Sequence, residues 1–223
     1  MLSYEMLLTR ILRVMPRGAA FAAPLRSSAV PCGRIGVIPL RLKRGVVVII
    51  VGSSRRNGNT SLIVEVLAEK LGCEVFNLSD YSISYYDYEN QNEDDDFVEL
   101  AAKMVEASYL VFATPVYWYS MSGQMKVFFD RFTDLITIRK PVGRSLAGKQ
   151  TFLVATGSEQ NLPEGFEAAF RLTSDYFGMK FKGSCYVRFK EDLAPTHGFQ
   201  EVIERFLLQF RDGYNESLEM TPR

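Results

Sequence analysis

The chain alternates short apolar runs with segments of helical periodicity, and this alternation limits the folds open to it. Five runs have the length of single strands: Val46–Val51, Glu74–Leu78, Tyr109–Thr114, Gln150–Thr156 and Lys182–Phe189. Five segments repeat apolar residues at helical spacing: Ser61–Leu71, Phe97–Ala107, Gly123–Asp134, Glu164–Phe177 and Phe199–Arg211. Strands that alternate with helices form a parallel sheet covered on both faces. We therefore predict an α/β three-layer sandwich around a five-stranded parallel sheet of order 2-1-3-4-5.

Length and charge predict one domain behind a basic extension. A chain of 223 residues suits one sizeable domain. Residues 1–45 carry eight Arg or Lys side chains against one acid, so the formal net charge of zero leaves residues 46–223 with a charge of −7. We predict that residues 1–45 form a disordered basic N-terminal extension and that residues 46–223 form the domain. A transit peptide, or sequence upstream of the true start, is the alternative for the extension.

The composition argues against several classes of partner. The acidic surplus of the domain disfavours nucleic acid, because phosphate contacts need clustered Lys and Arg. No apolar run approaches the roughly 20 residues that a membrane span needs. Cys32, Cys73 and Cys185 lie far apart and His197 is the one histidine, so no metal site is predicted. Free thiols indicate a reducing, cytoplasmic location, and we expect Cys185 and His197 to be structural.

Two loops follow strands at the edge of the sheet where ligands bind in such folds, the carboxyl edge. The first, GSSRRNGNTS, lacks both GxxxxGK[ST] and GxGxxG. It still has the parts of an anion site, namely a helix start, small residues and polar side chains. The candidate donors are Ser53, Asn57, Asn59, Thr60 and Ser61, with Arg55 or Arg56 adding charge. A plain turn in which Asn59 or Thr60 caps the helix explains the loop equally well by itself.

The second loop, PVYWYSMSG, places three consecutive aromatic residues after Pro115, namely Tyr117, Trp118 and Tyr119. Exposed rings favour a flat ligand, because stacking contributes roughly 0.5–1.5 kcal/mol beyond area burial. The alternatives are that the rings pack under the loop or at a subunit contact. The helix that follows has an apolar stripe, expected to face the core, of Met125, Phe128, Phe129 and Phe132. Lys126 and Asp130 are spaced to pair on its surface.

Taken together, the two loops resemble those of the NAD(P)H-dependent FMN reductases and quinone reductases of the flavodoxin-like superfamily. GSSRRNGNTS is similar to the family's phosphate loop, GSxRxxGNTS. PVYWYSMSGQMKVFFDR is similar to the loop that holds the isoalloxazine ring. The resemblance covers roughly Val46–Phe189 and implies a flavodoxin-like fold that binds FMN.

The resemblance also implies roles for individual residues. Those around the FMN phosphate would be Ser53, Arg55, Asn57, Asn59, Thr60 and Ser61. Those along the ring would be Pro115, Val116, Tyr117, Trp118 and Tyr119. A shorter match, ATGSEQN, adds Thr156, Gly157 and Ser158. The implied enzyme is a homodimer that passes hydride from NAD(P)H through FMN to a quinone, flavin, azo or nitroaromatic acceptor, with no catalytic side chain.

The segment YSISYYDYENQNEDDDF departs from the family pattern. Many relatives carry a cysteine cluster there, but this segment has none, and an iron–sulfur centre needs about four thiolates. Its tyrosines are expected to cover the mouth of the site or to join a dimer contact. Its acidic end, Glu93–Asp96, is expected to be a solvated run at a helix start. Two alternative functions remain open, a flavodoxin-type electron carrier and a flavin-binding regulatory protein.

Overall fold

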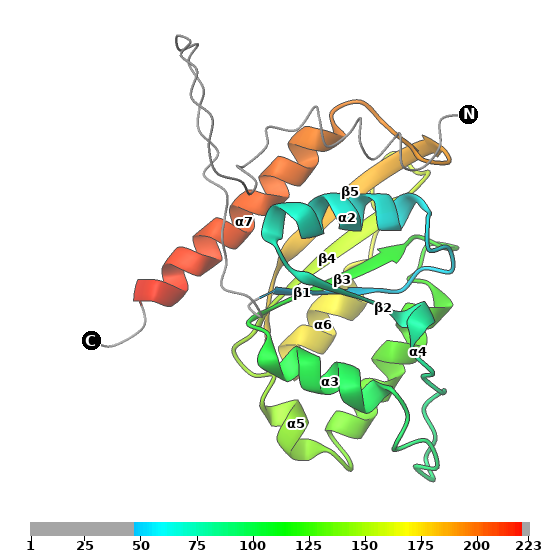
Figure 1. Ribbon diagram of the computed structural model, residues 1–223, viewed down its shortest axis with the longest axis vertical. Coiled ribbons are helices and arrows are strands. Elements are labelled where there is room, and N and C mark those ends of the chain that lie inside the picture. The colour runs from blue at the N-terminus through cyan, green and yellow to red at the C-terminus, as the bar shows by residue number, and fades with distance from the viewer. Residues whose placement is uncertain (1–46, 220–223) are drawn as a thin grey trace, which may run out of the picture.

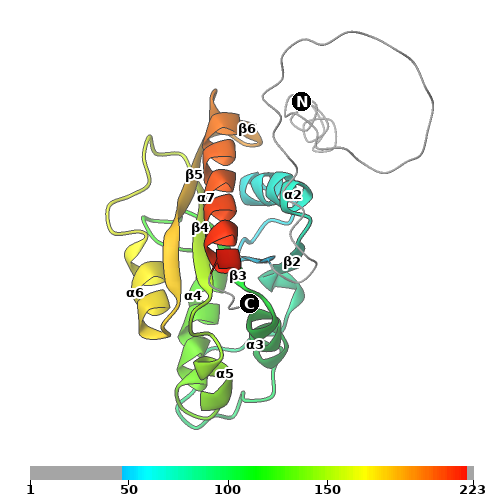
Figure 2. The same cartoon turned by 90° about the vertical axis from the view of Figure 1, so that its left-hand side faces the viewer.

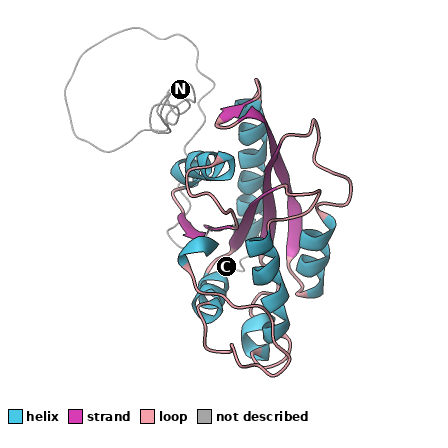
Figure 3. Ribbon diagram, turned by 90° about the vertical axis from the view of Figure 1, so that its right-hand side faces the viewer, coloured by secondary structure: helices cyan, strands magenta, loops and turns pink. Residues whose placement is uncertain are grey.

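The structure is a computed structural model that describes residues 47–219, with side chains described as far as Phe210 (Figure 1). The prediction made for residues 1–45 lies outside the described residues, as does Val46. Within the described part, a central sheet separates two layers of helices (Figure 3). The three-layer flavodoxin-like arrangement is therefore confirmed.

The sheet has the predicted order with one addition. Its strands are β1 (Val47–Val51), β2 (Glu74–Asn77), β3 (Tyr109–Pro115), β4 (Gln150–Gly157), β5 (Lys180–Glu191) and β6 (Ala194–Pro195). The order is β2-β1-β3-β4-β5-β6, and the first five strands are parallel. The prediction of five strands is wrong by one, because β5 runs two residues beyond Phe189 and reverses into the antiparallel β6. A two-residue strand leaves no periodicity to detect.

Five helices of the described residues match the predicted positions, with different ends, and the short helix Lys140–Arg144 was not predicted. The helices are α2 (Asn59–Leu71), α3 (Phe97–Glu106), α4 (Gly123–Asp130), α5 (Lys140–Arg144), α6 (Ala168–Tyr176) and α7 (Phe199–Glu219), with 3-10 turns η1 (Leu78–Asp80) and η2 (Arg131–Leu135). The predicted helix Gly123–Asp134 is divided between α4 and η2, since apolar spacing does not separate an α-helix from a 3-10 turn. Figure 2 shows α7, the longest helix, lying alongside β4 and β5.

Side chains that point alternately to the two faces of the sheet form two hydrophobic cores, one on each face. Val47, Ile49 and Val51 of β1 face α2 and α7, whereas Val48 and Ile50 face α3, α4 and α6. All five are no more than 3% exposed. This is the near-continuous apolar pattern of a strand buried on both sides. The predicted stripe of α4 and η2, namely Met125, Phe128, Phe129 and Phe132, is confirmed as core.

The acidic end of the tyrosine-rich segment is not simply solvated, which corrects the prediction for Glu93–Asp96. Asp95 forms an ion pair with Arg131, which is 1% exposed, and accepts a hydrogen bond from the amide of Ser84. The Arg131 guanidinium also pairs with Asp134 at 2.8 Å and donates to the carbonyl of Asn92 at 2.8 Å. The buried guanidinium of Arg131 thus holds the segment against η2. Composition alone does not reveal such a contact between residues far apart in the chain.

The described residues hold neither a helix long and apolar enough to cross a bilayer nor a group of three or more His, Cys, Asp or Glu side chains placed for a metal ion. Cys185 is buried in the core between the sheet and α7. Burial raises the pKa of its thiol to about 12, so it stays protonated. Burial likewise raises the pKa of Cys73 to about 12. Neither group therefore supplies a thiolate nucleophile near neutral pH.

Candidate functional site

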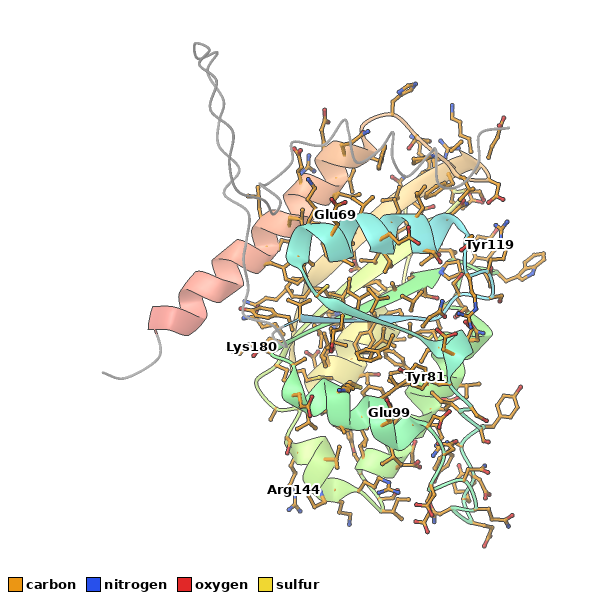
Figure 4. All side chains as sticks on the ribbon, viewed as in Figure 1. Glu69, Tyr81, Glu99, Tyr119, Arg144 and Lys180 are labelled. Carbon is orange, nitrogen blue, oxygen red and sulfur yellow. The ribbon has the colours of Figure 1, made fainter. Side chains whose placement is uncertain are left out.

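Loops after three neighbouring strands meet around a cavity of about 320 Å³ at the carboxyl edge of the sheet. Tyr119 lies at this end and Lys180 at the opposite end (Figure 4). The cavity is lined by Ser53, Arg55, Gly58, Asn59, Thr60, Pro115, Val116, Tyr117, Thr156, Gly157, Ser158 and residues 189–192. A larger cavity of about 450 Å³, between α5 and the end of α6, involves segments that precede strands. We place the site in the first cavity, because the crevice of this fold lies at the carboxyl edge.

The start of α2 has features that suit an anion. Its N-cap is Gly58, which makes no side-chain capping bond, and the first turn holds no acid. The capping alternative for Asn59 and Thr60 is therefore wrong: the side-chain Oδ1 of Asn59 accepts from the amide of Leu193 at 2.7 Å. The first helical amide groups stay available, and they carry partial positive charge. The hydroxyls of Ser53 and Ser61 both donate to the carbonyl of Arg55 and shape the loop.

Ser122 joins the first loop to the second. Its hydroxyl donates to the carbonyl of Gly52 at 2.7 Å and accepts from the amide of Met125 at 3.2 Å, so it also caps α4. Its own amide donates to the hydroxyl of Thr114 at 3.0 Å. The approach is close enough that a Cβ on Gly52 would lie 2.8 Å from the Cβ of Met125. Only glycine fits between β1 and α4 at this point.

The third loop is held against both others. The hydroxyls of Thr60 and Thr156 lie 2.7 Å apart, and the amide of Val116 donates to the carbonyl of Thr156 at 2.7 Å. From β5, the Tyr186 hydroxyl donates to the carbonyl of Glu159 at 2.8 Å. Burial, and secondarily the charge of Glu159, raise the pKa of Tyr186, so its hydroxyl retains the proton that it donates. The walls of the cavity are therefore set by hydrogen bonds between residues distant in sequence.

The two arginines of the first loop point in different directions. Arg55 lines the cavity and pairs with Asp192 at 2.8 Å. Arg56 pairs with Asp80 of η1 instead. Sequence alone left open which of the two would serve an anion, and the geometry favours Arg55. Asn57 is exposed and lies outside the lining.

The middle of the second loop forms an unusual turn. The amide of Tyr117 donates to the carbonyl of Ser120 at 2.9 Å, and the amide of Ser120 donates back at 3.1 Å. The two residues between them have positive φ, 48° at Trp118 and 64° at Tyr119. The left-handed region disfavours bulky side chains by roughly 1–3 kcal/mol each. These rings are 93% and 68% exposed, so packing does not offset the strain.

The structure brings together ten of the fourteen residues predicted for the site. The four outside the lining are Asn57, Ser61, Trp118 and Tyr119. Residues 189–192, at the end of β5, line the cavity but were not predicted. The available signal was their position at the carboxyl end of the last parallel strand, since that edge is shared by all the loops that form the site. His197 is exposed in the turn before α7 and lies outside the lining.

The sequence profile of the NADPH-dependent FMN reductases matches residues 46–192. The chain belongs to this family. It is 29% identical over 153 residues to YwqN of Bacillus subtilis, whose name describes an NAD(P)H-dependent FMN-containing oxidoreductase, covering 61% of this chain and 81% of that protein. It is 29% identical over 96 residues to the NADPH azoreductase of Bacillus sp. OY1-2, covering 43% and 54% of the two chains.

Among solved structures, the Trp repressor binding protein of Bacillus subtilis has a TM-score of 0.53 at 25% identity, covering 64% of this chain and 84% of that one. The predicted family, fold and enzyme class are thus confirmed. FMN is the cofactor that the family name states, and NADPH the reductant. The residues of the site also fit FMN, because a helix start without a capping side chain, beside buried hydroxyl groups, suits one phosphate.

We expect Gly52→Ala to lower the free energy of unfolding by about 1–3 kcal/mol, because the new Cβ would collide with Met125. The matched control is Gly123→Ala at the start of α4, where a Cβ would meet nothing within 4 Å. It should change stability by less than about 0.5 kcal/mol. Urea unfolding followed by circular dichroism measures both. Equal effects of the two substitutions would contradict the close approach of β1 and α4.

Trp118→Gly should raise the free energy of unfolding by about 0.5–1 kcal/mol, since it relieves a positive φ at a side chain with little packing. Tyr176→Gly is the control, because Tyr176 is also an exposed aromatic residue, 70% accessible, but lies in α6. There glycine should destabilise by about 1 kcal/mol. Thermal unfolding distinguishes the two, and a destabilised Trp118→Gly variant would argue against strain in the turn.

Proposed function

We propose that the protein is an FMN-dependent NAD(P)H oxidoreductase that reduces a small acceptor. The observation that carries the proposal is the uncapped start of α2, which opens into the same cavity as the turn after β3. When bound, FMN supplies the hydride chemistry between nicotinamide and acceptor. The protein's part is to bind and orient, so no acid, base or nucleophile is assigned.

Different residues serve the two ends of the cofactor in this proposal. The phosphate would accept from the amide groups at the start of α2 and from Arg55, with Ser53, Thr60 and Ser61 nearby. The ring would lie along the backbone of Pro115, Val116 and Tyr117 and of Thr156, Gly157 and Ser158. Asn57 and Asn59 remain at the phosphate end as peripheral donors. Trp118 and Tyr119 would cover the ring from the strained turn.

The acceptor we propose is a quinone, free flavin, azo or nitroaromatic compound. These are flat molecules that suit the exposed aromatic side chains beside the cavity, Tyr117 at 43% and Trp118 at 93% exposure. The similarity to an NADPH azoreductase supports an acceptor of this class.

We also propose a cytoplasmic homodimer. The exposed rings of Tyr85, Tyr88 and Trp118 support the dimer as contacts for a second copy, and the two protonated thiols suit a reducing compartment.

Anaerobic mixing with NADPH or NADH tests the function directly. The FMN-loaded protein should lose its yellow absorbance rapidly, because the nicotinamide can reach a ring in an open cavity, and adding a quinone or azo dye should restore it. Stopped-flow spectrophotometry measures both rates, with free FMN as the control. Bound flavin that stays yellow with either nucleotide would contradict the reductase and favour an electron carrier or a regulatory flavin-binding protein.

A further inference from the structure

We propose that Asp192 is an internal competitor of the cofactor phosphate for Arg55. On this view, the hairpin formed by the end of β5 and by β6 holds the anion site until a phosphate takes its place. The inference rests on the proposed function, because it assumes that the site binds FMN. It adds a residue that controls how tightly the phosphate end is held.

The first observation is the ion pair itself. Nη1 of Arg55 lies 2.8 Å from Oδ2 of Asp192, although the two residues are 137 positions apart. Both residues line the cavity. A carboxylate oxygen therefore occupies the direction in which this guanidinium would hold a phosphate oxygen. Carboxylate and phosphate are alternative partners for the same fork of donors.

The second observation is that the pair is exposed. The side chains are 59% and 48% accessible for Arg55 and Asp192 respectively. Ion pairs at this exposure are weak, because water and salt screen them. A phosphate carries more charge and has more acceptor oxygens than a carboxylate, and the amide groups of α2 add to its binding. The phosphate is thus the stronger partner, and Asp192 is displaceable.

The third observation concerns the hairpin that carries Asp192. Its tip makes two polar contacts with the first loop, the ion pair with Arg55 and the hydrogen bond from the amide of Leu193 to the side chain of Asn59 at 2.7 Å. Leu193 has φ of 54°, and β6 has only two residues. Leu193 packs against the core on the α2 side, which holds the backbone of the tip in place. The Asp192 side chain is exposed, so it can release Arg55 by a change of rotamer that leaves the sheet undisturbed.

Neutralising the charge of Asp192 distinguishes two roles for this residue, because it would change FMN affinity in opposite directions. Glu191 also lines the cavity, so two carboxylates face the anion site, with Lys190 beside them. If Asp192 competes with phosphate, its neutralisation should tighten FMN binding. If Asp192 instead positions Arg55 for the phosphate, neutralisation should weaken binding. The two roles make opposite predictions.

The test compares Asp192→Asn with Glu191→Gln, a matched loss of one charge in the same hairpin and cavity lining. Dissociation constants come from quenching of flavin fluorescence, with riboflavin as the probe that lacks the phosphate. We expect Asp192→Asn to tighten FMN binding by about twofold to fivefold, the range open to an exposed ion pair. Riboflavin binding should not change, and Glu191→Gln should give a clearly smaller gain. In an Arg55→Ala background, Asp192→Asn should give no more gain than Glu191→Gln does.

Three results would overturn the inference. The first is FMN binding that weakens or stays the same in Asp192→Asn. The second is an equal gain in Glu191→Gln, which would indicate general relief of repulsion rather than competition for Arg55. The third is a gain that persists undiminished without Arg55. Wild-type protein that binds neither FMN nor riboflavin would contradict the proposed function itself, and the inference with it.

Discussion

The geometry of the site depends on the hydroxyl of Ser122. This buried group donates to the carbonyl of Gly52 and accepts from the amide of Met125, so one oxygen connects the end of β1 with the start of α4. Without it, a buried carbonyl and a helix amide would lose their partner, which costs about 1–3 kcal/mol per group. The contact brings the phosphate loop and the aromatic turn to the same cavity, although 70 residues separate Gly52 from Ser122.

The resulting cavity has two chemically different ends. At one end, a helix start without a capping side chain and the cation of Arg55 suit an anion. At the other, backbone groups of the loops after β3 and β4 meet beside exposed aromatic residues. Around the cavity, Trp118 and Tyr119 of the aromatic turn and Leu193 of the β5–β6 hairpin adopt positive φ. Backbone strain of this kind persists where surrounding contacts overdetermine it, which is common at functional sites.

Sequence reasoning was most successful where local patterns carry the information. The strand order followed from five apolar runs separated by helices, and the stripe from Met125 to Phe132 from its spacing. It failed where partners lie far apart in the chain. The acidic run around Asp95 predicted that this carboxylate is solvated, but in the structure it forms an ion pair with the buried Arg131. The hairpin at Asp192 and the N-cap at Gly58 were likewise missed, because both depend on contacts between loops.

We propose that one cavity, where the loops after β1, β3 and β4 meet, holds FMN with its phosphate at the start of α2. A crystal structure of the FMN complex tests this placement. We expect phosphate oxygens within hydrogen-bond distance, about 3 Å, of the amide groups of Asn59, Thr60 and Ser61, with the ring against Pro115–Tyr117. Flavin density in the cavity lined by Leu135, Lys140 and Tyr176, or a phosphate away from α2, would contradict it.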